Sequence, residues 1–356
     1  MNQTQILRRA WKILWSYRTL WIFGIILALT SVSPRSNNVN YQLSSEDFNN
    51  GRPFITPPAD VAKEFERMVD TLEAYLTPER LHSLVGIAIA LICLLLLVAV
   101  VFRIANYVSR VALIRMVDRY ETTEQKVSWK QGFRLGWSRP AWKLFLIDLV
   151  IYVPLVLVFV ALFGCAALPL ATSMLAGEEP GAVSLVTMIG ALFLVIFAVF
   201  IITLLLSLVM ELIRRECVLK ESGAVDSIRQ GLLLLRRQFK DVFLMWLILL
   251  GISIVFIVAM IPVIILFLGI GALVGAGMGY LAYTIWGVAG DVTTILTAIA
   301  VGLAFFFPII VIPLAFLGGL RETYISTAWT LTYRELNLLE SVTAEIPSPA
   351  EPAPET

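Results

Sequence analysis

The chain has 356 residues, of which 59% are hydrophobic and 15% are charged, and its formal net charge is +1. Soluble globular domains are about half apolar and about a quarter charged, so this composition excludes a soluble protein with a polar surface. We therefore expect an integral membrane protein, and we expect the placement of its charges along the chain to be more informative than their sum.

Apolar runs long enough to cross a membrane need about 20 residues for about 30 Å of hydrocarbon. The first run is short, and the neighbouring Trp11, Trp15 and Trp21 are predicted to anchor it at the interface. A cleaved secretory signal is the alternative for this run, because basic residues precede it and LTSVSP follows it. The six predicted spans cover residues 20–32, 83–102, 144–170, 185–210, 242–268 and 292–317.

The basic residues predict the orientation of these spans. Four Lys or Arg precede the first span, nine lie between residues 103 and 143, seven lie between 214 and 240, and Arg321 and Arg334 follow the last span. These are 22 of the 27 Lys and Arg residues. Because cytoplasmic segments carry the excess of basic residues, we expect six spans in the cell (inner) membrane with both termini in the cytoplasm.

A short basic motif occurs twice. SWKQGFRLGW at residues 128–137 and SIRQGLLLLR at residues 227–236 share an S-x-[K/R]-Q-G core at an offset of 99 residues. The same offset relates Leu-Ile-Arg at 113–115 to Leu-Ile-Arg at 212–214. A fainter third copy near residue 15 aligns through its Trp-Ser pair. We predict an all-α polytopic membrane bundle of three repeated helical hairpins, with repeat units at about residues 1–115, 116–214 and 215–335.

The motif segments are predicted to be amphipathic helices in the membrane interface. Trp129, Phe133 and Trp137 are four residues apart and so share one helix face, and Ile228 with Leu232 starts a similar face in the second copy. Lys and Arg opposite an aromatic face are typical of interfacial helices. The residues that we expect to bind lipid headgroups or a partner are Lys130, Arg134, Arg229, Arg236, Arg237 and Lys240.

The repeated motif, together with the segment STAWTLTYREL after the last span, resembles the multi-pass membrane domain attached to some bacterial glycerophosphodiester phosphodiesterases. The resemblance covers nearly all of residues 1–340. It implies a membrane module without the catalytic barrel of those enzymes, which has no counterpart here.

Ionisable residues near the ends of spans are the candidates for a polar site. Asp148 and Glu211 lie near cytoplasmic ends of their spans, and Arg115 and Arg214 lie at comparable depth. Because charges within a membrane are costly, such residues are functional candidates by default. They could form a cluster that holds a headgroup or a coupling proton. Local pairing or snorkelling to the interface is the alternative, and it needs no function.

A glycine-rich segment follows the fifth span. We predict that the fifth helix ends near Leu268 and that residues 269–290 form a turn or a re-entrant segment, with a seventh span as the alternative. Gly271, Gly275 and Gly279 are four residues apart, which favours close packing against a neighbouring helix over a cavity lining.

The segments outside the spans are predicted to have separate roles. Residues 34–82 form an outer loop in which residues 61–76 read as an amphipathic helix, and residues 341–356 read as a disordered cytoplasmic tail. The single His82 and three cysteines near apolar runs provide no catalytic triad, metal site or disulfide framework. We expect no catalytic residues, no metal and no cofactor.

These features predict a non-enzymatic integral membrane protein that binds anionic lipid or organises membrane partners through a basic cytoplasmic rim. A protein partner in the membrane is possible in this hypothesis, and no nucleic acid is expected. The alternative is a small-molecule or lipid transporter that uses Asp148, Glu211 and the glycine-rich segment 269–290.

Overall fold

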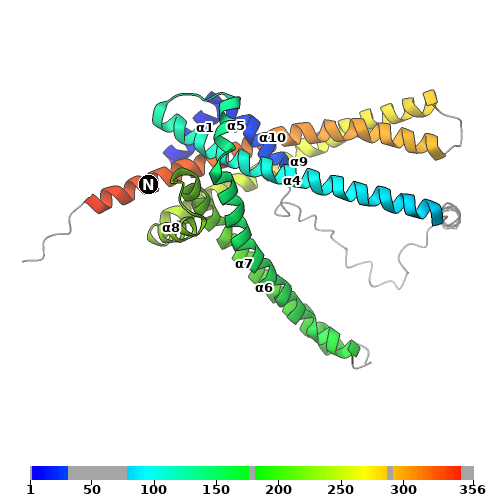
Figure 1. Ribbon diagram of the computed structural model, residues 1–356, viewed down its shortest axis with the longest axis horizontal. Coiled ribbons are helices and arrows are strands. Elements are labelled where there is room, and N and C mark those ends of the chain that lie inside the picture. The colour runs from blue at the N-terminus through cyan, green and yellow to red at the C-terminus, as the bar shows by residue number, and fades with distance from the viewer. Residues whose placement is uncertain (1, 31–77, 176–180, 287–291, 346–356) are drawn as a thin grey trace, which may run out of the picture. The chain divides into compact units, whose positions relative to one another are not determined.

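The computed structural model describes residues 2–30, 78–175, 181–286 and 292–345, and these are the residues discussed below (Figure 1). Every regular element in these ranges is an α-helix, which confirms the predicted all-α class. Five helices are long and apolar enough to cross a membrane, or six if a bent pair near the N-terminus forms one span. The chain is therefore a multi-pass helical membrane protein.

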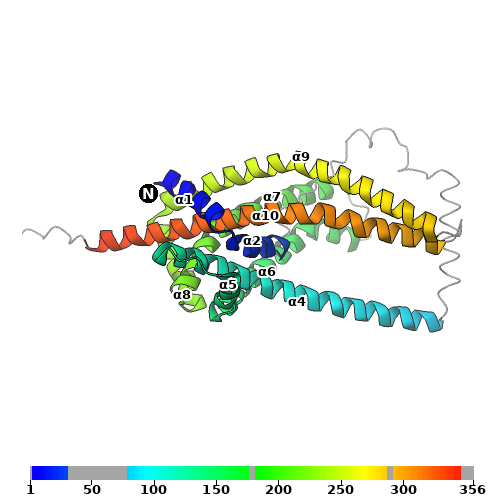
Figure 2. The same cartoon turned by 90° about the horizontal axis from the view of Figure 1, so that it is seen from above.

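The helices form three successive sets. The second and third sets have the same order, in which a short helix precedes two long helices. The bounds are α1 (Gln3–Ser16), α2 (Thr19–Thr30), α4 (Pro78–Thr123), α5 (Trp129–Gly136), α6 (Arg139–Leu175), α7 (Ala182–Leu219), α8 (Ala224–Arg237), α9 (Phe239–Trp286) and α10 (Val292–Glu345). Helix α6 packs along α7, and α9 packs along α10 (Figures 1 and 2).

The first predicted span is the short helix α2. It has 12 residues, so it extends only about 18 Å at 1.5 Å per residue. Helices α1 and α2 are bent by 101° at Tyr17 and Arg18. The Tyr17 hydroxyl donates to the Val127 carbonyl oxygen at 2.8 Å and accepts from the Val127 amide at 2.6 Å. These two buried hydrogen bonds connect the bend to the segment before α5.

Helix α9 corrects the prediction for the glycine-rich segment. It continues without a break from Phe239 to Trp286, so residues 269–286 form neither a re-entrant turn nor a separate seventh span. Pro262 lies within the helix, which membrane helices tolerate because neighbouring groups can satisfy the freed carbonyl. The glycines do not end the helix because they pack against α10, as described below.

Helix α10 is the longest element and corrects the predicted tail. Its 54 residues span about 80 Å at 1.5 Å per residue, well beyond the thickness of the hydrocarbon. Residues 341–345, predicted to be disordered, are its last turn. The rest of the predicted tail and the predicted outer helix at 61–76 lie outside the described residues, and the repeat boundaries stay a prediction.

The buried core lies near those ends of the helices that carry the charged residues. Tyr17, Leu113, Met116, Leu212 and Trp329 belong to one buried cluster. By contrast, in the most apolar 18-residue stretch of each of the five long helices, at most 17% of the residues are buried inside the protein. The chain divides into two compact units, residues 1–30 with 105–356 and residues 31–104. All contacts described below lie within the first unit.

Candidate functional site

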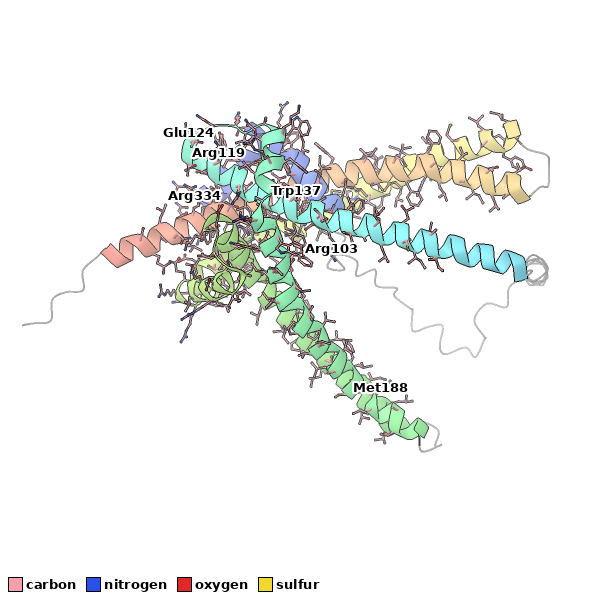
Figure 3. The ribbon with its side chains drawn as sticks, viewed as in Figure 1. Arg103, Arg119, Glu124, Trp137, Met188 and Arg334 are labelled. Atoms are coloured by element: carbon pink, nitrogen blue, oxygen red, sulfur yellow. The ribbon has the colours of Figure 1, made fainter. Side chains whose placement is uncertain are left out.

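Polar side chains from α4, α6, α7 and α10 meet beside this core. In the first contact, Nη2 of Arg214 on α7 lies 3.3 Å from Oδ1 of Asp148 on α6. The Tyr107 hydroxyl on α4 donates to Oδ2 of the same carboxylate at 3.0 Å. Asp148 therefore accepts from two other helices. Figure 3 labels Arg119 near the end of α4, Glu124 directly after α4 and Arg334 in the last quarter of α10.

The second contact is centred on Glu211 of α7. Its Oε2 atom lies 2.6 Å from Nη1 of Arg215, and its Oε1 atom lies 3.9 Å from Nη1 of Arg214. Nη2 of Arg215 donates to the Ser326 carbonyl oxygen on α10 at 3.2 Å. The side chain of Arg215 is only 2% exposed. This arginine therefore joins α7 to α10 inside the protein.

A small cavity of about 30 Å³ lies within the polar cluster. That volume is enough to hold a water molecule. Across the described ranges, no group of three His, Cys, Asp or Glu residues lies close enough to hold a metal ion. The residues that line the cavity are Leu27, Arg110, Ile114, Glu211, Arg214, Arg215, Glu322, Ile325 and Ser326.

Arg115 departs from the prediction. Its guanidinium forms an ion pair with Glu221, which follows the end of α7, and it does not line the cavity with Arg214. Arg115 is five residues beyond Arg110, so the two side chains leave different faces of α4. Lys143 also donates to the Glu221 carbonyl oxygen, at 2.5 Å. Arg115 thus takes part in stabilising the connection between α7 and α8.

The predicted headgroup-binding residues lie on the short helices and at the start of α9. Lys130 and Arg134 are on α5, whereas the other four are at residues 229–240. All six side chains are exposed. Arg237 forms an ion pair with Glu340 of α10, and the Lys130 ammonium lies 5.6 Å from the centre of the Trp129 ring. The structure therefore leaves these residues accessible but does not bring them into one cluster.

Helix α5 has two different faces. Trp129, Phe133 and Trp137 are exposed, with Trp137 62% exposed, whereas Gly132 and Gly136 are buried against the protein. Phe133 and Trp137 stack with ring centres 5.9 Å apart. Large aromatic groups on the outside of a membrane protein are typical of the interface between lipid and water.

The glycine of the repeated motif has the same role in both copies. A Cβ atom on Gly132 would lie 2.6 Å from the Met116 sulfur at the end of α4. A Cβ atom on Gly231 would lie 2.7 Å from Cγ1 of Ile213 at the end of α7. The serines differ, because Ser128 precedes α5 whereas Ser227 is buried inside α8. The glycine allows each short helix to pack closely on the preceding long helix.

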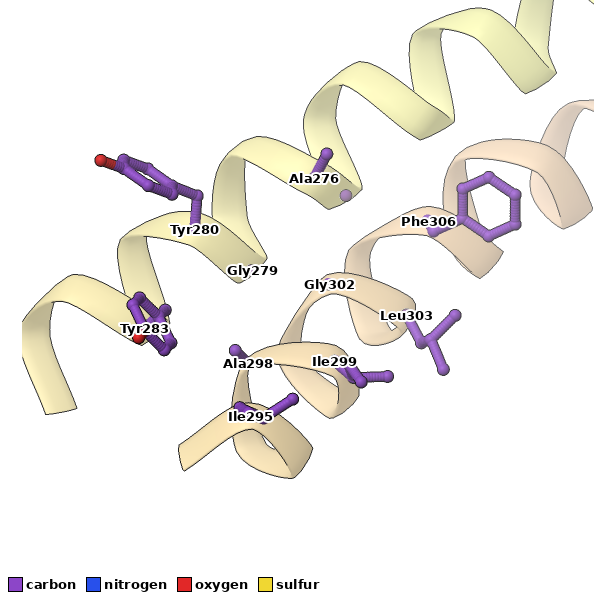
Figure 4. A pocket seen from close by; sticks show the side chains of 11 residues that line it. Ala276, Gly279, Tyr280, Tyr283, Ile295, Ala298, Ile299, Gly302, Leu303 and Phe306 are labelled. Atoms are coloured by element: carbon purple, nitrogen blue, oxygen red, sulfur yellow. The ribbon is translucent and has the colours of Figure 1, made fainter. Parts of the chain in front are cut away.

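The glycine-rich part of α9 packs closely on α10, which confirms the predicted helix contact. A Cβ atom on Gly275 would lie 2.9 Å from the Gly302 carbonyl oxygen, and one on Gly279 would lie 2.9 Å from the Ala298 carbonyl oxygen. A groove of about 530 Å³ accompanies this contact and is almost entirely apolar (Figure 4). Its lining includes Tyr280 and Tyr283.

Comparison with known families matches residues 7–342 to DUF7544, a family of unknown function. The chain belongs to this family. No curated protein and no solved structure matches the chain. The DUF7544 match begins within α1 and ends within α10, so it includes every member of the polar cluster and all six exposed basic residues. The resemblance to the membrane domain of the phosphodiesterases stays a prediction.

Sequence reasoning missed three members of the polar cluster in this DUF7544 protein. Arg110, Arg215 and Glu322 line the cavity, although only Arg214 and Glu211 were predicted there. Arg215 directly follows Arg214, and its position one turn after Glu211 is the signal that could have placed it. Arg110 and Glu322 had no comparable local signal, since their neighbours in the cluster come from other helices.

Proposed function

We propose that this protein is a non-enzymatic membrane module that binds anionic lipid headgroups through the basic residues of α5, α8 and the start of α9. The observation that supports this function is the exposure of these basic side chains beside exposed apolar groups, which are aromatic rings on α5 and at the start of α9 and leucines on α8. Basic groups bind lipid headgroups, and aromatic rings prefer the interface between lipid and water. A single depth of these segments in the membrane would therefore suit both kinds of side chain.

The magnitude of the electrostatic attraction supports a collective role for the rim. Each Lys or Arg near an anionic surface contributes about 1 kcal/mol, and the effect declines within a Debye length. Arg237 would contribute less than the others because Glu340 already neutralises it. The remaining five form the anionic-lipid rim of this proposal: Lys130, Arg134, Arg229, Arg236 and Lys240.

The proposal includes the orientation of the molecule. The short helices α1, α5 and α8 would lie in the cytoplasmic interface as three copies of one leading helix, each followed by a hairpin of spans. Both termini would then be cytoplasmic, in the inner membrane of the cell. This arrangement would place all five rim residues on the leaflet that is rich in anionic lipid.

Native mass spectrometry of the protein in nanodiscs tests the proposal. With mixed phosphatidylglycerol and phosphatidylcholine, we expect retained anionic lipids that are largely lost in the Arg229→Gln, Arg236→Gln, Lys240→Gln variant. The matched control neutralises Arg35, Arg52 and Arg67 of the predicted outer loop and should retain these lipids. Equal lipid retention by all three proteins would refute a rim function.

Transport is a second candidate because the polar cluster combines an ion pair between α6 and α7, an ion pair within α7 and a cavity that α10 also lines. In this hypothesis Asp148 and Glu211 would carry a coupling proton or position a substrate. Asp148→Asn should then abolish substrate flux in proteoliposomes while the protein remains folded. Because residues 269–286 are a continuous helix, a re-entrant loop no longer contributes to this candidate.

A further inference from the structure

The cavity in the polar cluster has walls of two kinds. Leu27, Ile114 and Ile325 provide apolar surface, whereas guanidinium and carboxyl groups provide the rest. Its volume of about 30 Å³ is enough for a water molecule or an ion of similar size.

The charges around the cavity do not balance. Two of the three arginines that line it have a carboxylate partner: Arg214 pairs with Asp148, and Arg215 pairs with Glu211. The other carboxylate of the lining, Glu322, pairs with Arg321, which does not line the cavity. The third arginine of the lining, Arg110, donates from Nε to the neutral amide oxygen of Asn106 at 2.9 Å. Within the described part of the chain, no carboxylate lies within ion-pair distance of Arg110. One positive charge is therefore left over.

One buried donor of the cavity lining also lacks an acceptor. The Nε atom of Arg215 is buried and has no hydrogen-bond partner among the described residues. A guanidinium can only donate, so a suitable occupant of the cavity must accept hydrogen bonds. Burying an unpaired cation or donor is unfavourable, which gives such an occupant a reason to bind.

We propose that the cavity binds one small monovalent anion of halide size, held between Arg110 and Arg215. Such an ion satisfies three conditions at once. Its single negative charge neutralises the cluster, it accepts from the unpaired Nε of Arg215, and it fits a space the size of one water molecule. Water meets only the last two conditions. This site is distinct from the exposed basic rim, so it does not depend on the proposed lipid function.

The first experiment is a thermal unfolding titration of the full chain in detergent. The protein is prepared in gluconate, and chloride or bromide then replaces gluconate at constant ionic strength. We expect a saturable rise in Tm with either halide, and a bromide anomalous peak at the cavity in crystals. A Tm that is independent of the halide concentration would mean that the cavity holds only water, and the proposal would fail.

Two variants with opposite charge changes separate ion binding from a structural role. Arg110→Gln removes the unpaired positive charge and should weaken halide binding at least tenfold. Glu322→Gln removes a negative charge from the wall and should strengthen halide binding severalfold. The exposed Arg8→Gln is the matched control and should titrate like the wild type. Retained halide binding in Arg110→Gln, or weakened binding in Glu322→Gln, would overturn the proposal.

A lipid phosphate is the competing source of negative charge. Repeating the titration with phosphatidylglycerol in gluconate buffer distinguishes it from a halide. If phosphatidylglycerol raises Tm, the halides do not, and Arg110→Gln removes the lipid effect, then the cavity is the end of a lipid site and the halide assignment is wrong.

Discussion

The charged ends of the helices and the apolar outer half of the α9–α10 hairpin are held together differently. At the charged ends, α2, α4, α7 and α10 share a buried cluster, an ion pair joins α4 to α10, and a hydrogen bond to a backbone carbonyl joins α7 to α10. In the outer hairpin, two helices meet through Gly275, Gly279 and Gly302, and most other side chains are exposed. Lipid solvates apolar side chains as well as a protein core does, so only close or polar contacts add specific stability there.

This comparison predicts where substitutions will be most damaging. The largest effect is expected at Glu211, because Glu211→Ala leaves Arg215 buried without its carboxylate. Breaking a buried ion pair from one side costs about 3–5 kcal/mol. The free energy of unfolding, measured in bicelles, should fall by about this amount. The exposed Glu124→Ala is the control, and an equal loss there would contradict a special role for the polar cluster.

The next largest effect is expected where α2 crosses α10. A Cβ atom on Gly319 would lie 2.7 Å from the Cα atom of Ile25, so Gly319→Val must separate two backbones. Overpacking of this kind costs about 3 kcal/mol at the upper end of its usual range. Thermal unfolding should show the loss, whereas Gly164→Val, with nothing within 4 Å of the added Cβ, should be nearly neutral.

A smaller effect is expected at the bend between α1 and α2. Tyr17→Phe removes the hydroxyl that bonds both the amide and the carbonyl of Val127. Leaving these buried backbone groups unpaired costs about 1–3 kcal/mol. Amide hydrogen exchange of residues 124–130 should accelerate in the variant. Unchanged exchange there would show that the hydrogen bonds do not hold the bend.

The smallest effect is expected in the outer hairpin. Gly275→Val places side-chain atoms against the Gly302 carbonyl, but α9 and α10 can separate into lipid and relieve the clash. We expect a loss of about 1 kcal/mol, at the low end of the overpacking range. Urea or SDS unfolding of the purified protein measures it. A loss as large as that of Gly319→Val would erase the distinction between the two regions.

The sequence predicted much of the framework and part of the candidate site. Each predicted span lies largely within a helix, and the contact between Asp148 and Arg214 joins two residues that were selected from their depth alone. The predicted end of the fifth helix near Leu268 is wrong, because neither the proline nor the glycines break α9. In the structure, these glycines are at the surface that packs against α10.

The composition and charge pattern by themselves determined an all-helical, multi-pass protein. In lipid, a helix satisfies its own backbone hydrogen bonds, and each apolar run is long enough for a helix to cross all or most of the hydrocarbon. The tertiary structure alone decided which charges meet. Arg110, Arg215 and Glu322 come together from α4, α7 and α10, because each helix has a particular rotation and depth. Those quantities depend on packing between residues more than 100 positions apart, such as Arg215 and Ser326, which no local pattern encodes.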